Sequence, residues 1–450
     1  MAMAVVLVLL VVGSLIFHFA SPWWFTPIAS NWTAMDDTVI ITFWVTGIAF
    51  VALNLFMAYA VWKYRYQKTR LAKYEPENKK LEWWLTAVTS VGVVAMLTPG
   101  LFVWAKFVEV PHDATVVEVV AQQWNWSFRF PGKDGALGAS SAKLISVDNP
   151  FGLDPKDAKG LDDVLVPGAE LHLPIGKPVK ILLRSKDVLH DFTVPQFRVK
   201  MDMVPGMITY LWFTPTKQGN YDIMCEELCG IAHFAMRGRV IVDDEKGFQT
   251  WLATQQTFSE QTAIAAGDAA AGESAFAPCA ACHGAKGEGN PQQNAPKLAG
   301  QPAWYLARQL DNFKHGVRGA RDDDVNGKTM AAMAAILDDA GVKNVTTYLA
   351  GLPDQAAPST INGDASKGHS HYVTCAACHG QSGEGIWSTK APRLAHMSDW
   401  YMARQLQNFK KGIRGTHPAD FPGQQMTAMA KTLDNEQTAN DLLAYINSMR

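Results

Sequence analysis

The chain has 450 residues, which is enough for about three domains that each bury a core. Its 40 basic and 42 acidic side chains give a formal net charge of −2. We expect no nucleic acid as a partner, because there is no basic excess to neutralise phosphates. All six cysteines fall in three short motifs, so none is left over for a structural disulfide. The cysteines are therefore expected to bind metals or cofactors.

Two uncharged stretches near the start of the chain are long enough to cross a membrane. One lies between Asp37 and Lys63 and the other between Glu82 and Lys106, and each exceeds the ~20 residues that a spanning helix needs. The segment between them is short and basic, which predicts a cytoplasmic loop and places everything after Lys106 outside. We predict a transmembrane hairpin over 35–107, followed by domains in a bacterial periplasm.

A shorter apolar run precedes this hairpin, within residues 1–34. It lacks the basic start of a signal peptide and is marginal in length for a membrane span. We expect an extra retained transmembrane helix, and cleavage of this segment is the alternative.

Apolar and polar residues alternate in short runs from Ala114 to about Asp244, with Gly and Pro at the breaks. This period of two predicts an all-β barrel or sandwich, here a domain over 108–248. A stretch rich in Ala, Gly and Gln follows it, and we expect a linker over 249–265.

The last part of the chain contains an internal repeat. PKLAGQPAWYLARQLDNFKHGVRG, which begins at Pro296, matches PRLAHMSDWYMARQLQNFKKGIRG, which begins 96 residues later at Pro392. Two CAACH motifs are related by the same offset. The repeat predicts two copies of one small helical domain, over 266–355 and 362–450.

CxxCH is the attachment signal of c-type haem, in which two cysteines form thioethers and the histidine binds the iron. The residues concerned are Cys279, Cys282 and His283 in the first copy and Cys375, Cys378 and His379 in the second. Zinc is the alternative for CxxC pairs, but zinc pairs usually lie about 15 to 20 residues apart. These pairs are separated by a whole repeat, so we expect two covalently bound haems.

A methionine is the expected sixth iron ligand of a haem with a high potential. Each copy offers two candidates at matching places, Met330 or Met333 and Met426 or Met429. The spacing alone leaves the choice open.

CEELCGIAHFAM, residues 225–236, places two cysteines, a histidine and a methionine in the predicted β-domain. A mononuclear blue-copper site needs a single thiolate, two imidazoles and a weak axial methionine, so one cysteine is surplus. Two bridging thiolates would instead hold two copper ions, and His190 is the available second imidazole. A structural Cys₂His₂ zinc site is the alternative. We expect a dinuclear copper centre that shares one electron between its metals.

The motifs KKLEWW, QWNWSF, DVLHDFTVPQFRVKMDMVPG and CEELCGIAHFAM together resemble subunit II of a haem-copper cytochrome c oxidase, over residues 35–245. The two CAACH domains resemble di-haem cytochromes of the bacterial periplasm. The resemblance implies a multidomain protein with a transmembrane α-helical hairpin, an all-β cupredoxin-like Greek-key barrel and two all-α cytochrome c domains.

The resemblance also implies a copper A centre and roles for particular residues. The copper ligands would be the side chains of His190, Cys225, Cys229, His233 and Met236 and the backbone carbonyl of Glu227. The Glu227 carboxylate would also reach a magnesium or manganese ion at the interface with subunit I. Trp124 would carry electrons into copper A, and Glu82 would help to feed protons into the partner subunit.

In the cytochrome domains, the resemblance selects Met330 and Met426 as iron ligands. It also implies that the carbonyls of Pro296 and Pro392 orient the histidine ligands through their other ring nitrogen.

The implied function is that of an electron-transfer subunit in a proton-translocating respiratory oxidase. A periplasmic donor such as a cytochrome would reduce the two haems, and electrons would pass to copper A and on to haem in subunit I, which reduces O2 to water. The chain itself would hold no catalytic residue for that reaction, and its partners would be subunit I and other oxidase subunits in a bacterial inner membrane. The alternatives are the small subunit of a copper A nitric oxide reductase and a free-standing, membrane-anchored redox carrier.

Overall fold

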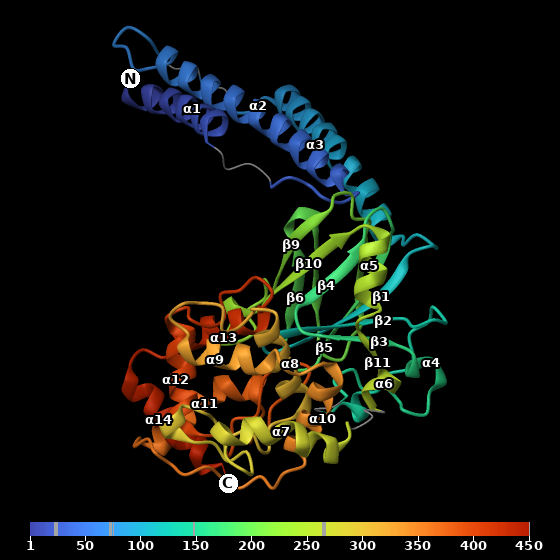
Figure 1. Ribbon diagram of the computed structural model, residues 1–450. Coiled ribbons are helices and arrows are strands. Elements are labelled where there is room, and N and C mark those ends of the chain that lie inside the picture. Colours follow the sequence, from blue (N-terminus) through green and yellow to red (C-terminus); the bar gives the residue numbers. More distant parts are fainter. Residues whose placement is uncertain (22–25, 72–73, 75, 147–148, 263–266, 450) are drawn as a thin grey trace.

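The computed structural model describes the chain except residues 22–25, 72–73, 75, 147–148, 263–266 and 450. Long helices lie at one end of the molecule, a β-domain lies in the middle, and a compact group of shorter helices lies at the other end (Figure 1). The multidomain class predicted from the sequence is confirmed.

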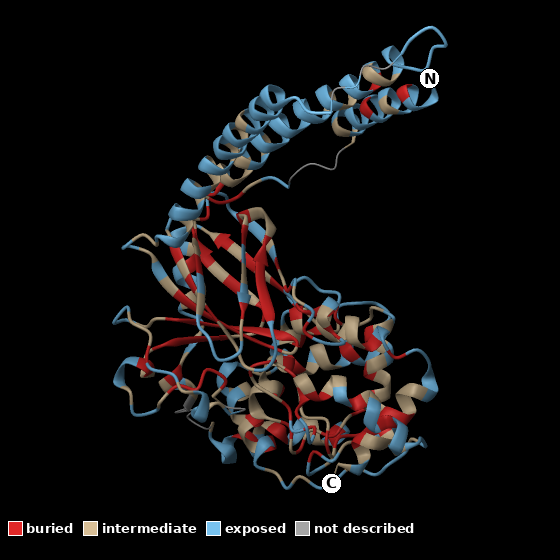
Figure 2. Ribbon diagram, turned by 180° about the vertical axis from the view of Figure 1, so that it is seen from behind, coloured by how far each residue is buried: buried red, intermediate tan, exposed pale blue. Residues whose placement is uncertain are grey.

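Three N-terminal helices are long and apolar enough to cross a membrane by length and composition. They are α1 (Ala2–Ala20), α2 (Thr33–Lys63) and α3 (Lys79–Val108). Most of their side chains are exposed, which suits an environment of lipid (Figure 2). α1 packs along α2, and the Arg65 guanidinium after α2 donates a hydrogen bond to the Met1 sulfur at 3.4 Å. The start of α1 therefore lies beside the loop between α2 and α3.

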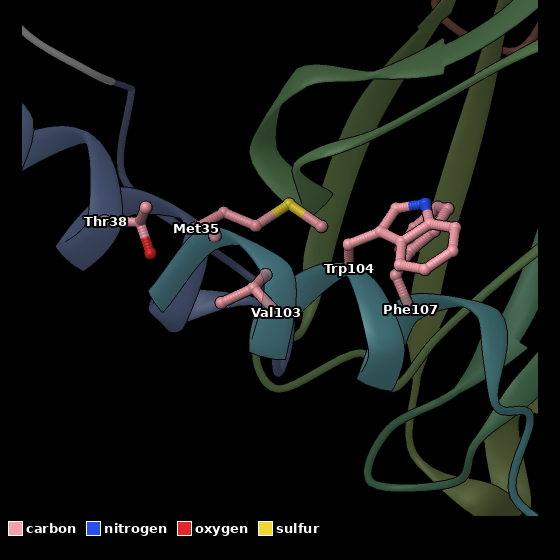
Figure 3. Close-up of a pocket in the computed structure, with 6 residues that line it drawn as sticks. Met35, Thr38, Val103, Trp104 and Phe107 are labelled. Carbon is pink, nitrogen blue, oxygen red and sulfur yellow. The ribbon is translucent and has the colours of Figure 1, made fainter. Parts of the chain in front are cut away.

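The connection between α1 and α2 is attached to the β-domain. The backbone N–H of Ala29 donates to the Gln196 carbonyl at 2.8 Å, and the Trp32 indole N–H donates to the Trp212 carbonyl at 2.9 Å. At the same junction α2 and α3 form a shallow apolar groove (Figure 3). Its lining residues are Met35, Thr38, Gly100, Val103, Trp104 and Phe107.

The β-domain consists of two sheets packed face to face, a cupredoxin-like arrangement. One sheet has the order β11-β3-β2-β1-β5-β8 and the other β4-β10-β9-β6-β7. The pairs β1–β5 and β4–β10 are parallel, and the other pairs are antiparallel. The strands are β1 (Thr115–Gln122), β2 (Asn125–Phe130), β3 (Val164–Pro167), β4 (Glu170–Pro174), β5 (Val179–Ser185), β6 (His190–Val194), β7 (Val199–Met203), β8 (Thr209–Phe213), β9 (Gly219–Met224), β10 (Arg237–Asp243) and β11 (Gln256–Thr257).

The alternation read from the sequence corresponds to burial in this domain. Along β5 and β10 every second residue is buried between the sheets. Short helical turns connect the strands: η1 (Ala142–Leu144), α4 (Ala158–Leu161), η2 (Pro195–Phe197) and η3 (His233–Ala235). The predicted all-β class of this region is confirmed.

The structure has regular elements within much of the segment 249–265 for which we expected a linker. Helix α5 (Glu245–Leu252) runs into it, β11 pairs with β3, and α6 (Phe258–Thr262) follows. The physical reason is apolar burial: Trp251 packs against the β-domain core, and Phe258 is buried in a neighbouring cluster. Residues 263–265 of the predicted linker lie outside the described residues.

The remaining helices form two repeats with matching elements. The first repeat contains α7 (Ala269–His283), η4 (Pro291–Gln293), α8 (Ala303–Lys314), α9 (Val325–Ala334) and α10 (Asp339–Ala350). The second repeat contains α11 (Ala365–His379), α12 (Asp399–Lys410), α13 (Phe421–Lys431) and α14 (Glu436–Ser448). In each repeat the first helix packs against the last, so each copy has its own core.

The two repeats meet through reciprocal contacts. Arg318 of the first donates to the Tyr401 hydroxyl at 2.7 Å, and Arg414 of the second donates to the Tyr305 hydroxyl at 3.4 Å. Each residue of one pair lies 96 positions from its counterpart in the other. Such reciprocity is the mark of an approximate two-fold relation between similar units.

Candidate metal and haem sites

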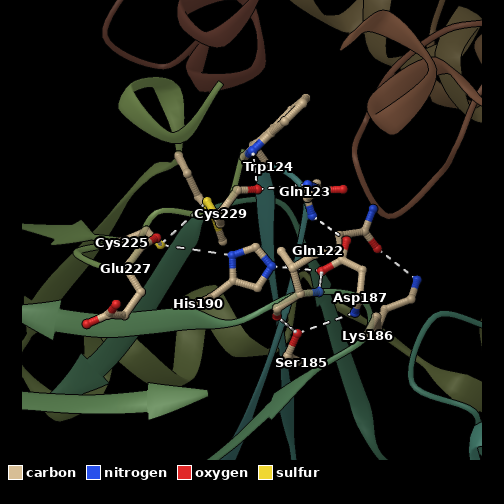
Figure 4. Close-up of polar contacts among 12 residues, drawn as sticks. Gln122, Gln123, Trp124, Ser185, Lys186, Asp187, His190, Cys225, Glu227 and Cys229 are labelled. Atoms are coloured by element: carbon tan, nitrogen blue, oxygen red, sulfur yellow. Dashed lines mark hydrogen bonds and ion pairs between the residues drawn. The ribbon is translucent and has the colours of Figure 1, made fainter. Parts of the chain in front are cut away.

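Three buried metal-ligating side chains lie together at one end of the β-domain (Figure 4). His190 begins β6, whereas Cys225 and Cys229 lie in the loop that follows β9. The two sulfurs are 3.7 Å apart, and the Cys225 sulfur is 3.9 Å from Nδ1 of His190. A disulfide has sulfurs ~2.05 Å apart, so these are two free cysteines with room for metal between them.

The other predicted ligands surround the same two sulfurs. Nδ1 of His233 lies 3.4 Å and the sulfur of Met236 lies 3.8 Å from the Cys229 sulfur. The Cys225 thiol donates to the Glu227 carbonyl at 3.3 Å. Two thiolates, two imidazoles and a thioether form a soft donor set that suits copper. The residues present therefore fit a dinuclear copper centre.

Asp187 is a further member of this site, and the sequence analysis missed it. Its carboxylate lies 2.8 Å from Nε2 of His190, on the side of the ring opposite the sulfurs (Figure 4). A carboxylate on one ring nitrogen fixes the orientation of a metal-ligating histidine. The sequence shows only that Asp187 lies three residues before His190, and acidic residues at that spacing occur for many reasons other than orienting a ligand.

The two cysteines titrate as a pair. The neighbouring Cys229 sulfur lowers the pKa of Cys225 to about 3 by hydrogen bonding to its thiolate, and His190 adds to this effect. The pKa of Cys229 is raised, first because its thiol is held in the hydrogen bond with the Cys225 sulfur, and then because the group is buried and faces the Cys225 charge. Both sulfurs must lose their protons if both are to bind metal.

Trp124 joins this site to the second repeat. Its indole N–H donates to the Cys229 carbonyl at 3.1 Å, and its ring points away from the sulfurs (Figure 4). Only 7% of Trp124 is exposed, because the second repeat lies against this end of the β-domain. The Asn125 amide donates to the Ser388 carbonyl at 2.9 Å, and the backbone N–H of Trp124 faces the Cys378 sulfur. Phe421 is buried in the same apolar cluster as Trp124.

Each CAACH motif ends its helix with a buried histidine. Nδ1 of His283 lies 2.8 Å from the Pro296 carbonyl, and Nδ1 of His379 lies 2.8 Å from the Pro392 carbonyl. The histidine donates in both bonds, which leaves Nε2 free for iron. Burial lowers the pKa of both imidazoles and so favours the neutral form that binds a metal. Within each motif the cysteines are three residues apart on one helix and share a face.

The candidate methionines lie on equivalent helices, α9 and α13. Met429 packs against the β-domain core as well as lying in the second repeat. Met426 lies one helical turn earlier and does not belong to the apolar cluster that Met429 joins.

Two predicted residues lie apart from these groups. Glu82 is exposed in the first turn of α3, where its carboxylate accepts a hydrogen bond from the Asn78 backbone at 3.4 Å. The Glu227 carboxylate points away from the cysteines (Figure 4). Neither carboxylate belongs to a described group of three metal-ligating side chains.

Comparison with known proteins divides the chain into the same β-domain and two helical repeats as the structure. Residues 115–243 match the family described as cytochrome C oxidase subunit II, periplasmic domain, and residues 269–353 and 365–450 each match the cytochrome c family. The chain is 59% identical to the alternative cytochrome c oxidase subunit 2 of Bradyrhizobium diazoefficiens over 259 residues, which is 58% of this chain and 94% of that protein.

The helical repeats have relatives of their own. Cytochrome c4 of Pseudomonas aeruginosa is 35% identical over 195 residues, 42% of this chain and 91% of that protein. The crystal structure of reduced recombinant cytochrome c4 from Pseudomonas stutzeri is 31% identical with a TM-score of 0.34, and the match covers 40% of this chain and 98% of that chain.

Proposed function

Since the chain belongs to the cytochrome c oxidase subunit II family and ends in tandem cytochrome c domains, we propose that it is the electron-transfer subunit of a respiratory haem-copper oxidase. The chain takes electrons from a periplasmic donor and delivers them to haem in subunit I, where O2 is reduced to water. It spans a bacterial inner membrane with its β-domain and repeats in the periplasm.

One observation carries this proposal: the two free cysteines, two histidines and Met236 gather directly behind Trp124, and the second CAACH motif covers Trp124 from the other side. Copper A and two c-type haems, when bound, would supply centres that each gain and lose one electron. Cys225, Cys229, His190, His233, Met236 and the Glu227 carbonyl would hold the copper. His283 with Met330 and His379 with Met426 would hold the haem irons.

The side chains around these ligands keep them rigid. Asp187 fixes His190, and the Pro296 and Pro392 carbonyls fix the two haem histidines. A site that changes shape little between redox states transfers electrons quickly, because little reorganisation is needed. Trp124 provides the bonded connection, from its backbone beside Cys378 to its indole on the Cys229 carbonyl.

Two residues receive proposed roles that need the partner subunit. The Glu227 carboxylate, which points away from the sulfurs, would bind magnesium or manganese together with ligands from subunit I. Glu82, at the cytoplasmic start of α3, would help to bring protons to the partner. The chain presents no oxygen-reducing site of its own in this proposal.

Copper and haem analysis of Cys225→Ser tests the dinuclear assignment. We expect two coppers and two haems in the unmodified chain, and one copper or none with two haems in the variant. The electron paramagnetic resonance signal of one unpaired electron shared by two coppers should also disappear. Leu228→Ala is the matched control, because Leu228 is 83% exposed in the same loop and should leave both signals unchanged. Two coppers in Cys225→Ser, or zinc in the unmodified chain, would refute the assignment.

Purification in mild detergent tests the oxidase role. The chain should come out with a large polytopic partner that contains haem and copper. Isolation of the chain alone, with its copper and haems intact, would contradict the proposal and support a free-standing carrier instead.

A further inference from the structure

We infer that the first repeat carries the docking surface for a soluble one-electron donor protein, and that the second repeat is the internal link between the first repeat and the copper site. This inference rests on the proposed function and adds to it the order of the two haems and the place where electrons enter the chain.

The second repeat turns one face toward the β-domain. This face, called here the inner face, includes Cys378, Ser388 and Phe421, with Ala377 and Gln424 beside them. Phe421 is only 7% exposed, and the Asn125 amide binds the Ser388 carbonyl. Arg239 of β10 donates to the Gln424 side chain at 3.3 Å. The side of the second CAACH motif that carries Cys378 therefore lies against the β-domain.

The first repeat has an equivalent face, and it is exposed. The residues 96 positions earlier are Ala281, Cys282, Gln292, Val325 and Lys328, and all five are exposed. Val325, the counterpart of Phe421, is 69% exposed. We call this surface the outer face. The two copies share one fold, and Cys282 and Cys378 occupy equivalent positions in them. The outer face is therefore the part of the first repeat that corresponds to the surface lying against Trp124 in the second repeat.

The composition of the outer face indicates what it binds. Apart from Lys328 its residues are uncharged, and the Lys328 ammonium is paired with the Asp322 carboxylate at 2.5 Å. The inner face docks on a β-domain surface that is also largely apolar, where Trp124, Ala232 and Ala235 are buried and Arg239 is the charged residue in contact with the inner face. The occupant of the outer face is therefore expected to be a small protein that surrounds its own redox centre with uncharged, partly apolar residues.

The alternative is that the donor protein delivers its electron directly at Trp124, and the second repeat excludes this because it covers Trp124. A donor protein cannot dock on Trp124 while the second repeat lies against it. A haem held by Cys279, Cys282 and His283 would supply the centre that accepts the single electron given up by the reduced donor, and no atom would be transferred. The Arg318–Tyr401 and Arg414–Tyr305 contacts hold the two repeats together, so a haem in the second repeat would be the next centre on the way to the copper site.

The substitution Val325→Asp tests the outer face in the full chain. The control is Val373→Asp, because Val373 is 63% exposed on the second repeat and does not belong to either face. The binding partner is a soluble c-type cytochrome whose iron is replaced by zinc, so that binding is measured without electron transfer. We expect Val325→Asp to raise the Kd about ten-fold or more, because a charge is placed in an uncharged contact. Val373→Asp should leave the Kd unchanged.

Rapid mixing with the reduced iron form of the same cytochrome distinguishes a failure of this inference from a failure of the proposed function. Val325→Asp should slow haem reduction by the protein donor about ten-fold, in parallel with the Kd. It should leave reduction by a small ruthenium ammine complex unchanged. No binding by the unmodified chain, equal Kd values for both variants, or self-association in place of donor binding would overturn the inference. If the haems are reduced but the copper never is, the proposed function fails whatever Val325→Asp does.

Discussion

His190 is 35 residues from Cys225 in the chain, yet Nδ1 of its ring lies 3.9 Å from that sulfur. Sequence reasoning reached His190 because four other ligands lie within residues 225–236 and few histidines remain in the β-domain. It did not reach Asp187, because nothing in a sequence distinguishes a carboxylate that orients a ligand from one on the surface. Ligands close together in the sequence can therefore be predicted, whereas the residues that position them need the fold.

Met426 and Met429 form a pair of neighbours with different expected roles. We predict that Met426→Leu removes the sulfur ligand of the second haem iron and with it the methionine-to-iron charge-transfer absorption. Met429→Leu should keep that absorption and cost ~1 kcal/mol or less of stability, because Leu and Met have similar volume where Met429 packs against the β-domain. Visible spectra and thermal unfolding of both variants check the prediction. The opposite pattern would assign the iron to Met429.

At the scale of elements, the sequence predicted the membrane-spanning helices from long apolar runs and the β-domain from alternating residues, whereas it predicted the repeats only as helical domains. β11 has two residues, and a strand that short leaves no periodicity to read. The sequence predicts two similar cytochrome domains after the β-domain, but it does not indicate which of them lies against Trp124. The repeats are too similar in their motifs to decide it, and the difference lies in single positions such as Phe421 and Val325, whose importance appears only when burial is known.

The interface between the repeats contains a buried ion pair that can be tested. The Lys297 ammonium lies 2.5 Å from the Asp354 carboxylate, and its side chain is 3% exposed. Arg393 and His396 of the second repeat bind the same carboxylate. We predict that Asp354→Asn destabilises the repeats by about 3 kcal/mol, because Lys297 is left buried without a counter-charge. Denaturant unfolding followed by haem absorption measures the change.

Asp339→Asn is the matched control for that experiment. Asp339 is fully exposed and lies 3.6 Å from Lys314, so its loss should change stability by less than about 0.5 kcal/mol. Burial raises the pKa of Asp354, but the ion pairs with Lys297, His396 and Arg393 hold it below its ordinary value. The stability from this carboxylate is therefore present above pH ~4 and is lost as the pH falls through the lowered pKa. Equal effects of the two substitutions would show that the buried pair contributes nothing.

At the scale of the whole molecule, the order of the repeats, the β-domain and the N-terminal helices in space agrees with the proposed direction of electron transfer. The outer face lies on the repeat that does not cover Trp124, and the N-terminal helices leave the β-domain at the end opposite the repeats (Figure 1). The sequence predicted the membrane hairpin from its hydropathy, but it left the fate of the first apolar segment open. The structure adds contacts that bear on this point, because the α1–α2 connection is bonded to the β-domain through Ala29 and Trp32.

These contacts favour retention of α1 as a third membrane helix. The connection must lie on the periplasmic side with the β-domain, while the Arg65–Met1 contact places the start of α1 beside the cytoplasmic loop. A largely apolar helix of 19 residues between those two points is long enough to span the bilayer. We predict that protein purified from membranes retains the Ala20–Ser21 bond, so mass spectrometry of a chymotryptic digest should recover peptides that cross it. Peptides that begin at Ser21, without any peptide from residues 2–20, would show instead that the segment is removed.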